Sequence, residues 1–257
     1  IFNKNDFSYL TSIGNFGEGP EEITVMGCLA IDEAHHQLYV SDHAKQKIFS
    51  YDMDSVMVDS LYKPQVKTAM NETLFPSEYQ YINDTLSIAL LIKPTSTSTF
   101  NQFLGRWNMN TGEMIPMKYT HPDIQKKRIT FAASEKAGIY VECYTRHDLM
   151  TICSLDGELL YNIYGPDWDG GNGNKLQSFG TVMIGNDKIF VSYCGEDYAR
   201  DSFPTKILVF DLEGNYLKTL ETGYKISDCC YDSFNNRIIL SLNDVVQFAY
   251  LDIDGII

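Results

Sequence analysis

Long apolar runs are missing from this sequence. No apolar stretch approaches the roughly twenty residues that a membrane-spanning helix requires, so we expect a soluble chain. Basic residues are also scarce, with 20 Lys and Arg against 34 Asp and Glu and a formal net charge of −14. Because an acidic surface repels phosphate backbones and anionic lipids, we expect no nucleic-acid partner and no direct contact with a membrane surface.

Cysteine is too sparse for a disulfide-built scaffold. The 6 cysteines lack the C-x-x-C spacing of zinc and redox sites, so we expect most of them to be small buried residues. Cys143 and Cys153 need separate treatment, because they lie on the two arms of an expected hairpin around Asp148. Two alternatives stay open for this pair: a cross-strand disulfide in an oxidising compartment, or two reduced thiols in the core.

Motifs of common enzyme classes are absent as well. The sequence has no G-x-S-x-G nucleophile elbow, no H-E-x-x-H helix and no phosphate-binding Gly-Lys-Thr loop. Seryl hydrolase, zinc protease and nucleotidase activities therefore lack their usual support. We expect no catalytic residues, and the sequence favours a non-enzymatic role over an enzymatic one.

What the sequence does contain is a pair of turn signals that recur every fifty residues or so. The first is a short polar turn between apolar runs, at residues 32–36, 83–85, 134–138, 185–188 and 232–236. The second follows about twenty to twenty-five residues later, at residues 52–55, 108–112, 155–157, 212–215 and 252–255. Internal repeats of this length indicate a propeller, a solenoid or an array.

The apolar runs between these turns are short and rich in β-branched and aromatic residues, as antiparallel strands require. The first repeat predicts strands over residues 28–31, 37–41, 47–51 and 56–61. The same order recurs in the later repeats, and four-stranded sheets repeated about an axis are the blades of a propeller. The sequence therefore predicts an all-β propeller of four-stranded antiparallel blades, without a long helix, as a single domain over residues 1–257.

The number of turns bears on the number of blades. There are five turns of the first kind but six of the second, once residues 3–6 are included. The chain thus has five repeats, the last of which stops as its fourth strand would begin, preceded by a half blade at residues 1–13. Two closures stay open. A six-bladed ring would take further strands from upstream of Ile1, whereas a five-bladed ring would pair residues 7–13 with residues 245–250.

A resemblance to a known family is carried by residues 7–22, which read FSYLTSIGNFGEGPEE. They resemble the connector of TolB-like and NHL-like six-bladed propellers of bacterial envelope proteins. The blade core of that family is similar to LYVSD at 38–42 followed by KIFSYD at 47–52, and to residues 159–167 and 207–215. The resemblance implies six blades and an extracytoplasmic protein of the periplasm or cell surface, often held by an N-terminal lipid anchor, here expected upstream of Ile1. It carries over no catalytic residues.

Ligands of propellers usually bind at the end where the loops between second and third strands meet the connections between blades. The first segment expected there is the long polar loop 195–204, with Glu196, Asp197, Tyr198 and Arg200 as candidate ligand contacts. A solvated decoration is the alternative for this loop.

The second segment is 165–174, in which oxygen-bearing side chains alternate with glycines and Asp167, Trp168 and Asp169 are the candidate contacts. We expect no bound cofactor, with calcium as the alternative because it favours hard oxygen ligands. Trp168 either stacks on a sugar or peptide ring or covers the propeller edge, and a flexible connector with an exposed Trp168 is the bland alternative.

The third segment is the turn 145–148, with Arg146 and His147 as rim contacts; residues 42–45 match it in the first repeat. A His beside an Asp suggests acid–base chemistry, but neighbours in a turn rarely face each other, so a solvated turn is expected.

Three classes of function stay open. The favoured class is a monomeric, non-catalytic binding or scaffolding module with a protein or glycan partner. The second is a metal-assisted lactonase-like or lyase-like enzyme, whose inward-facing ligands the innermost strands barely supply. The third is a glycoside hydrolase with paired carboxylates.

Overall fold

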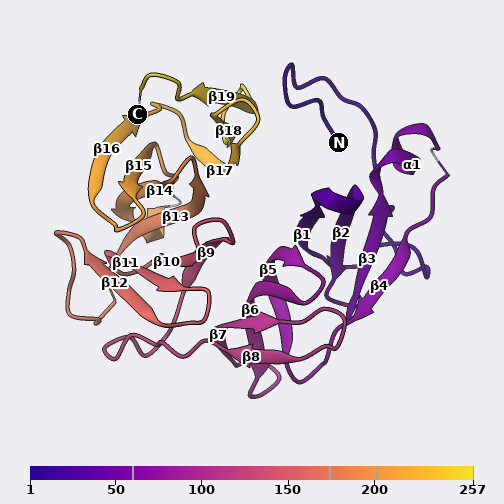
Figure 1. Cartoon of the computed structure of the whole chain (residues 1–257), viewed down its shortest axis with the longest axis horizontal. Helices are drawn as coiled ribbons and strands as arrows, with labels where there is room; N and C mark the ends of the chain where they lie inside the picture. The colour runs from indigo at the N-terminus through magenta and orange to yellow at the C-terminus, as the bar shows by residue number, and fades with distance from the viewer. Residues whose placement is uncertain (60, 174, 201, 257) are drawn as a thin grey trace. The chain divides into compact units, whose positions relative to one another are not determined.

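The computed structural model describes residues 1–59, 61–173, 175–200 and 202–256, apart from the side chain of Tyr198. The chain divides into two compact units, Ile1–Met117 and Lys118–Ile257 (Figure 1). Within the described ranges no helix is long and apolar enough to cross a membrane.

The N-terminal unit contains two four-stranded antiparallel sheets, each a meander of strands that follow one another in sequence. The first sheet consists of β1 (Met26–Asp32), β2 (Gln37–Asp42), β3 (Lys47–Asp52) and β4 (Gln65–Ala69). The second consists of β5 (Phe75–Asn83), β6 (Leu86–Pro94), β7 (Phe100–Trp107) and β8 (Met114–Pro116). One apolar core joins them, and it includes Tyr39, Ile48, Tyr79, Leu91 and Trp107.

The C-terminal unit contains three further antiparallel meanders. They consist of β9 (Ile129–Ser134), β10 (Ile139–Tyr144), β11 (Leu149–Ser154) and β12 (Leu159–Tyr164); of β13 (Leu176–Gly185), β14 (Lys188–Asp197), β15 (Lys206–Asp211) and β16 (Tyr216–Glu221); and of β17 (Ile226–Asp232), β18 (Arg237–Leu242) and β19 (Phe248–Asp252). Two apolar cores lie between neighbouring sheets of this unit. Face-to-face packing of successive four-stranded meanders is the arrangement of propeller blades, so the predicted fold class is confirmed.

The strand predicted at residues 56–61 is wrong, because a short helix takes its place. The helix α1 (Met53–Val58) begins at Asp52, whose side chain accepts a hydrogen bond from the Ser55 N–H at 2.8 Å. An aspartate at this position stabilises the first turn of a helix. Val56 is buried, whereas Val58 is 87% exposed, and the fourth strand of the sheet follows at β4.

The register of β10 and β11 decides between the two alternatives for the cysteine pair. Cys143 lies opposite Met150 and Cys153 opposite Tyr140, so the two cysteines point to opposite faces of the sheet. The hairpin is also centred ahead of Asp148 rather than on it. Both cysteines are buried free thiols, which is the second alternative.

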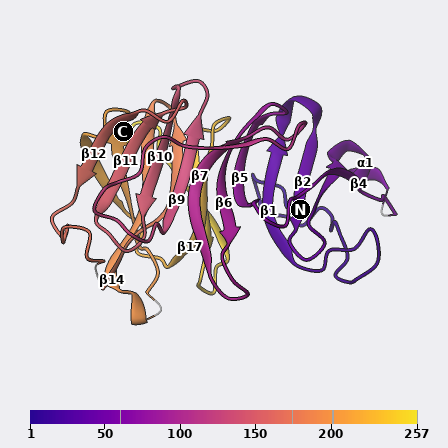
Figure 2. The same ribbon diagram turned by 90° about the horizontal axis from the view of Figure 1, so that it is seen from below.

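Successive loops of the C-terminal unit meet at one end, here called the loop end. Backbone hydrogen bonds join them: the Thr145 N–H donates to the Arg128 carbonyl, the Ser178 N–H to the Thr145 carbonyl, and the Ile226 N–H to the Pro204 carbonyl. Figure 2 shows β14 reaching past its neighbours toward this end. The short turns at 134–138, 185–188 and 232–236 lie at the opposite end, here called the turn end.

Candidate functional site

A basic hollow of about 520 Å³ opens at the loop end of the C-terminal unit. Three segments line it: residues 121–128, here called the stretch before β9, the turn between β10 and β11, and the connection between β12 and β13. Lys126, Arg128, Arg146 and Lys175 give it four cationic side chains, against the single carboxylate of Asp123. In a chain with a net charge of −14, this is a local reversal of sign. A concave, cationic surface raises the local concentration of anions.

A glycine loop forms one wall of the basic hollow. Gly170, Gly171 and Gly173 all have positive φ, a backbone conformation that glycine adopts without steric cost. A Cβ atom on Gly171 would come within 2.5 Å of the Asp123 carbonyl oxygen, so the loop packs directly on the stretch before β9. The glycines predicted to let the segment 165–174 turn sharply therefore also bring two walls of the hollow together. Asn174 lies outside the described residues.

His147 lines the basic hollow but is not the solvated rim residue that the sequence predicts. Its side chain is only 6% exposed, and Asp148 is buried with it. The His147 Nδ1 atom has no hydrogen-bond partner among the described residues. Its nearest anionic neighbour is Asp169 Oδ1, which is 3.9 Å away and likewise without a partner there. Burial lowers the pKa of His147, with Asp169 opposing the effect, so the imidazole is neutral at pH 7.

Trp168 is half-buried against three other rings. The ring centroids lie 5.0 Å from Tyr164, 5.4 Å from His121 and 6.0 Å from His147. The His121 Nδ1 atom accepts the Asp123 N–H, which leaves Nε2 to donate to the Tyr164 hydroxyl at 3.0 Å. The aromatic cluster thus fastens the 165–175 connection to the stretch before β9. Trp168 is neither a freely exposed stacking platform nor part of a loose connector.

Asp148 holds the first residues of the 165–175 connection by hydrogen bonds. Its carboxylate accepts the Asp167 N–H at 3.0 Å, and its backbone carbonyl accepts the Gly165 N–H. A Cβ atom on Gly165 would lie 2.0 Å from Asp148 Oδ2, so only glycine fits there. Burial raises the pKa of Asp148. In the described ranges no three His, Cys, Asp or Glu side chains converge as a metal site would require.

The segment 195–204 is not the loop that the sequence predicts. Strand β14 continues through Glu196 and Asp197, which pair with Gln177 and Leu176 of β13, and a short 3-10 helix follows at Tyr198–Arg200. Gly195 has a φ of 70° and register shifts interrupt the ladder, so an irregular but paired arm replaces a free loop. Glu196 and Arg200 are exposed, whereas the Tyr198 side chain and Asp201 lie outside the described residues.

A second hollow of about 600 Å³ lies beside this arm. None of the described residues that line it is charged; they include Gln177, Thr181, Ser192, Ser202 and Asn243. The predicted contacts therefore fall into two places. Arg146 and His147 belong to the basic hollow with the 165–175 connection, and Glu196 and Arg200 belong to the arm.

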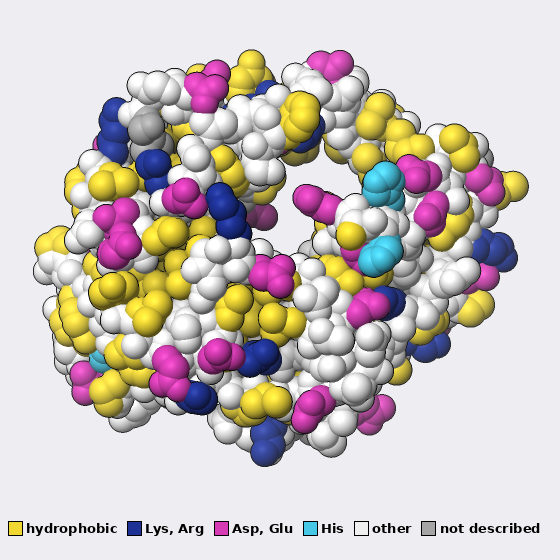
Figure 3. Space-filling view, viewed as in Figure 1, with side chains coloured by type: hydrophobic (Ala, Val, Ile, Leu, Met, Phe, Trp, Pro, Cys, Tyr) yellow, Lys and Arg dark blue, Asp and Glu magenta, His cyan; other side chains and the backbone are white. Residues whose placement is uncertain are grey.

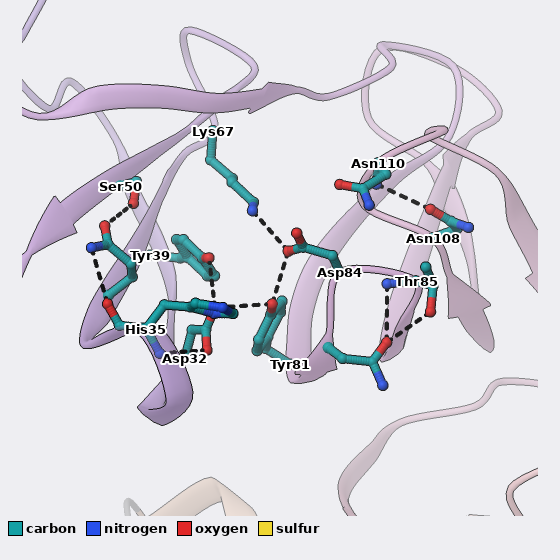
Figure 4. Close-up of polar contacts among 12 residues, drawn as sticks. Asp32, His35, Tyr39, Ser50, Lys67, Tyr81, Asp84, Thr85, Asn108 and Asn110 are labelled. Carbon is teal, nitrogen blue, oxygen red and sulfur yellow. Dashed lines mark hydrogen bonds and ion pairs between the residues drawn. The ribbon is translucent and has the colours of Figure 1, made fainter.

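A polar network in the N-terminal unit was not predicted from the sequence (Figure 4). The buried carboxylate of Asp32 accepts hydrogen bonds from His35 at 2.8 Å and from the Tyr39 and Tyr81 hydroxyls at 3.1 Å. The Tyr81 hydroxyl also lies 2.8 Å from Asp84, which forms an ion pair with Lys67. The network joins β1, β2 and β4 to the second sheet. Figure 3 shows histidine side chains (cyan) exposed over this region, beside acidic ones.

The surroundings of both carboxylates in this network favour their ionised form. Burial alone would raise the pKa of Asp32, but the hydrogen bonds from His35, Tyr81 and Tyr39 outweigh it and lower the pKa. Lys67 lowers the pKa of Asp84. A general acid needs a raised pKa, which neither group has. Ser134 and Asp232 hold the corresponding turns of two other sheets, so Asp32 belongs to a repeated structural position.

The histidines of the aromatic cluster predict a loss of stability in mild acid. Burial lowers the pKa of both His121 and His147 below the usual value of about 6.5. As the pH falls through that value, the unfolded chain takes up protons that the folded chain refuses. The free energy of unfolding should therefore be highest above pH 6.5, where both histidines are neutral in the folded and the unfolded chain, and should fall below that pH. Urea unfolding between pH 8 and pH 5 should show this slope.

His147→Phe should flatten the slope, because phenylalanine keeps a ring in the cluster but has no proton to bind. The matched control is His36→Phe, since His36 is exposed at the turn between β1 and β2. An unchanged slope in His147→Phe would contradict the assignment of this buried histidine.

The sheets define a β-propeller protein. Residues 1–144 match the model of the family DUF5128, which is described as a 6-bladed beta-propeller. Because the match covers more than half of the sequence, the chain belongs to this family. The family description agrees with the six blades that the resemblance implies, and the described residues form five sheets. No curated protein matches the sequence significantly.

Solved structures from Bacteroides share the fold. A member of the duf4221 family from Bacteroides vulgatus is 10% identical with a TM-score of 0.62, over 98% of this chain and 85% of that one. A protein of unknown function from Bacteroides caccae is 12% identical, with a TM-score of 0.52, over 90% and 78%. The extracellular domain of a candidate one-component system from B. thetaiotaomicron is 14% identical with a TM-score of 0.57. It is matched over 92% of this chain but only 29% of that chain.

Proposed function

We propose that this chain is a non-catalytic binding module of the bacterial cell envelope, related to TolB-like and NHL-like propellers, which holds a polar ligand at its loop end. The observation that carries the proposal is the basic hollow, where two of the predicted contacts, Arg146 and His147, lie together with the glycine wall. Sites of this kind are concave and present a few placed polar groups on a rigid scaffold.

The cellular location is proposed from the structural neighbours. One of them is described as an extracellular domain, and all three come from Bacteroides species. An extracytoplasmic module with an open hollow would meet ligands from outside the cell. A protein or a glycan fits this setting, and the chain would act as a monomer.

A binding screen tests the proposal. The protein is applied to arrays of glycans and of peptides, and each ligand is then measured with Arg146→Ala and with Lys136→Ala. Both variants remove one exposed cation from the same unit, but Lys136 lies at the turn end. We expect Arg146→Ala to weaken binding at least tenfold and Lys136→Ala to leave it within twofold. Ligands that bind Arg146→Ala as well as the unchanged protein would place the site elsewhere. Binding of the same ligands to Arg200→Ala tests whether the β14 arm contributes to the site.

A further inference from the structure

The basic hollow concentrates positive charge, and three of its four cations have no ion pair among the described residues. The exposed side chains of Lys126, Arg128 and Lys175 form no ion pair with any acidic residue of the described ranges, and Arg146 lies beside them. Several lysines elsewhere are ion-paired, such as Lys67 with Asp84 and Lys127 with Glu142. A cluster of cations in one concavity repels itself unless an anion enters it, so the ligand should carry negative charge.

His147 points to a ligand independently of this charge. It lines the same hollow and is more than nine-tenths buried, and its Nδ1 atom has no hydrogen-bond partner among the described residues. Asp169 Oδ1 lies 3.9 Å from it and has no hydrogen-bond partner there either. Buried polar side-chain atoms almost always have a hydrogen-bond partner, so an orphan at a concave surface calls for an explanation. A ligand hydroxyl group that accepts the N–H of His147 and donates to Asp169 would satisfy both atoms.

The lining also restricts the kind of molecule that carries the charge. The described residues of the lining include no apolar side chain: beside the charged residues they offer the amides of Gln125 and Asn172 and the glycine backbone. Protein partners are held chiefly by buried aromatic and apolar anchors, for which this hollow has no pocket. Amides and cations instead suit a molecule that is covered with hydroxyl groups and bears an oxyanion, because guanidinium groups pair with oxyanions in two parallel hydrogen bonds.

We propose that the basic hollow binds an acidic saccharide, a proposal that rests on the binding function proposed above. Arg128 and Arg146 hold its oxyanion, Lys126 and Lys175 add electrostatic attraction, and Gln125 and Asn172 hydrogen-bond its hydroxyl groups. The oxyanion is a carboxylate or a sulfate. Because the lysines and Arg128 are exposed, charge-removing variants at these positions should fold normally.

The test measures binding of four polymers to the whole chain by biolayer interferometry at low and moderate salt. Polygalacturonate carries carboxylates, dextran sulfate carries sulfates, dextran is neutral, and polyglutamate is an acidic peptide. We expect one of the two acidic saccharides to bind, more weakly at higher salt, and to identify the oxyanion. Lys126→Gln with Arg128→Gln should weaken binding at least tenfold. The matched control, Lys136→Gln with Lys188→Gln at the turn end, removes equal charge and should change it less than twofold.

Several results would overturn the acidic saccharide. These are equal binding of dextran, equal or tighter binding of polyglutamate, binding of neither acidic saccharide, or equal losses in the two double variants. The last result would mean that only net charge attracts the polymer. If the arrays yield a neutral ligand or a peptide that Arg146→Ala loses, the binding function stands and only the ligand class is wrong. If Arg146→Ala retains every array ligand, the proposed function itself fails.

Discussion

Lys127→Ala is expected to destabilise the C-terminal unit by about 3–5 kcal/mol, the usual cost of removing one partner from a buried ion pair. Lys127 Nζ lies 2.6 Å from Glu142 Oε1, and the two side chains are 8% and 0% exposed. The Tyr144 hydroxyl donates to the other carboxylate oxygen of Glu142 at 3.1 Å. Without Lys127 the Glu142 carboxylate would stay buried with a single neutral donor, and low-dielectric surroundings make an uncompensated charge costly.

Urea unfolding at pH 7 measures the effect, and the chain offers a matched control. Lys118 pairs with Glu158 in the same unit, but both side chains are 64% exposed, so Lys118→Ala should cost less than about 1 kcal/mol. The double variant Lys127→Met with Glu142→Leu should recover most of the loss, because it removes both charges and keeps the volume. A change in Lys127→Ala no larger than in Lys118→Ala would show that Glu142 is reached by water.

Asp42→Ala is expected to destabilise the N-terminal unit by about 3 kcal/mol or more, since each buried donor that loses its acceptor costs about 1–3 kcal/mol. The Asp42 side chain is fully buried. Its carboxylate accepts backbone N–H groups from Thr24 at 2.8 Å, Val25 at 3.1 Å, Ala44 at 3.0 Å and Lys45 at 3.2 Å. It therefore ties the connector before β1 to the turn between β2 and β3.

The dependence on pH has a definite sign. Burial alone would raise the pKa of Asp42, but the four backbone donors outweigh it and lower the pKa. The stabilisation is therefore present above the unfolded value of about 3.9 and is lost as the pH falls through the lower folded value. Unfolding between pH 7 and pH 2 should show a smaller acid-induced loss in Asp42→Ala than in the unchanged protein. Asp54→Ala is the control, because that carboxylate is 80% exposed. Equal pH midpoints of acid unfolding for Asp42→Ala and Asp54→Ala would contradict the stabilising role of the Asp42 carboxylate.

Most of the fold follows from local signals in the sequence. Strand pairs such as β2 with β3 and β10 with β11 are separated by short polar turns, and alternating apolar residues fix which face is buried. The sequence does not predict α1, because Val56 to Val58 suit a strand as well as a helix and only the Asp52 cap distinguishes them. The length of β14 also escapes prediction, because its last residues pair across register shifts that no local pattern reveals.

The sequence predicts which segments of the candidate site lie together, but not what surrounds them. Arg146 and His147 lie beside the 165–175 connection, as the order of strands predicts. The burial of His147 and Trp168 depends on His121, which comes from a segment about twenty-five to fifty residues earlier in the chain. A tertiary contact of this kind has no local signature. One signal was available: Lys126, Lys127 and Arg128 are consecutive cations in an acidic chain, and two of them line the basic hollow.

The turn end and the loop end of the sheets differ in how far their residues repeat. At the turn end of three sheets, Asp32, Ser134 and Asp232 occupy the same place and each accepts a local hydrogen bond that holds the turn. At the loop end, each connection has its own length and composition over the residues that the structure describes. The contacts that hold the turns thus recur from repeat to repeat at the turn end, whereas the connections at the loop end differ from one another. Substitutions in the connections of the loop end can therefore change that surface without altering the turns that hold the repeats.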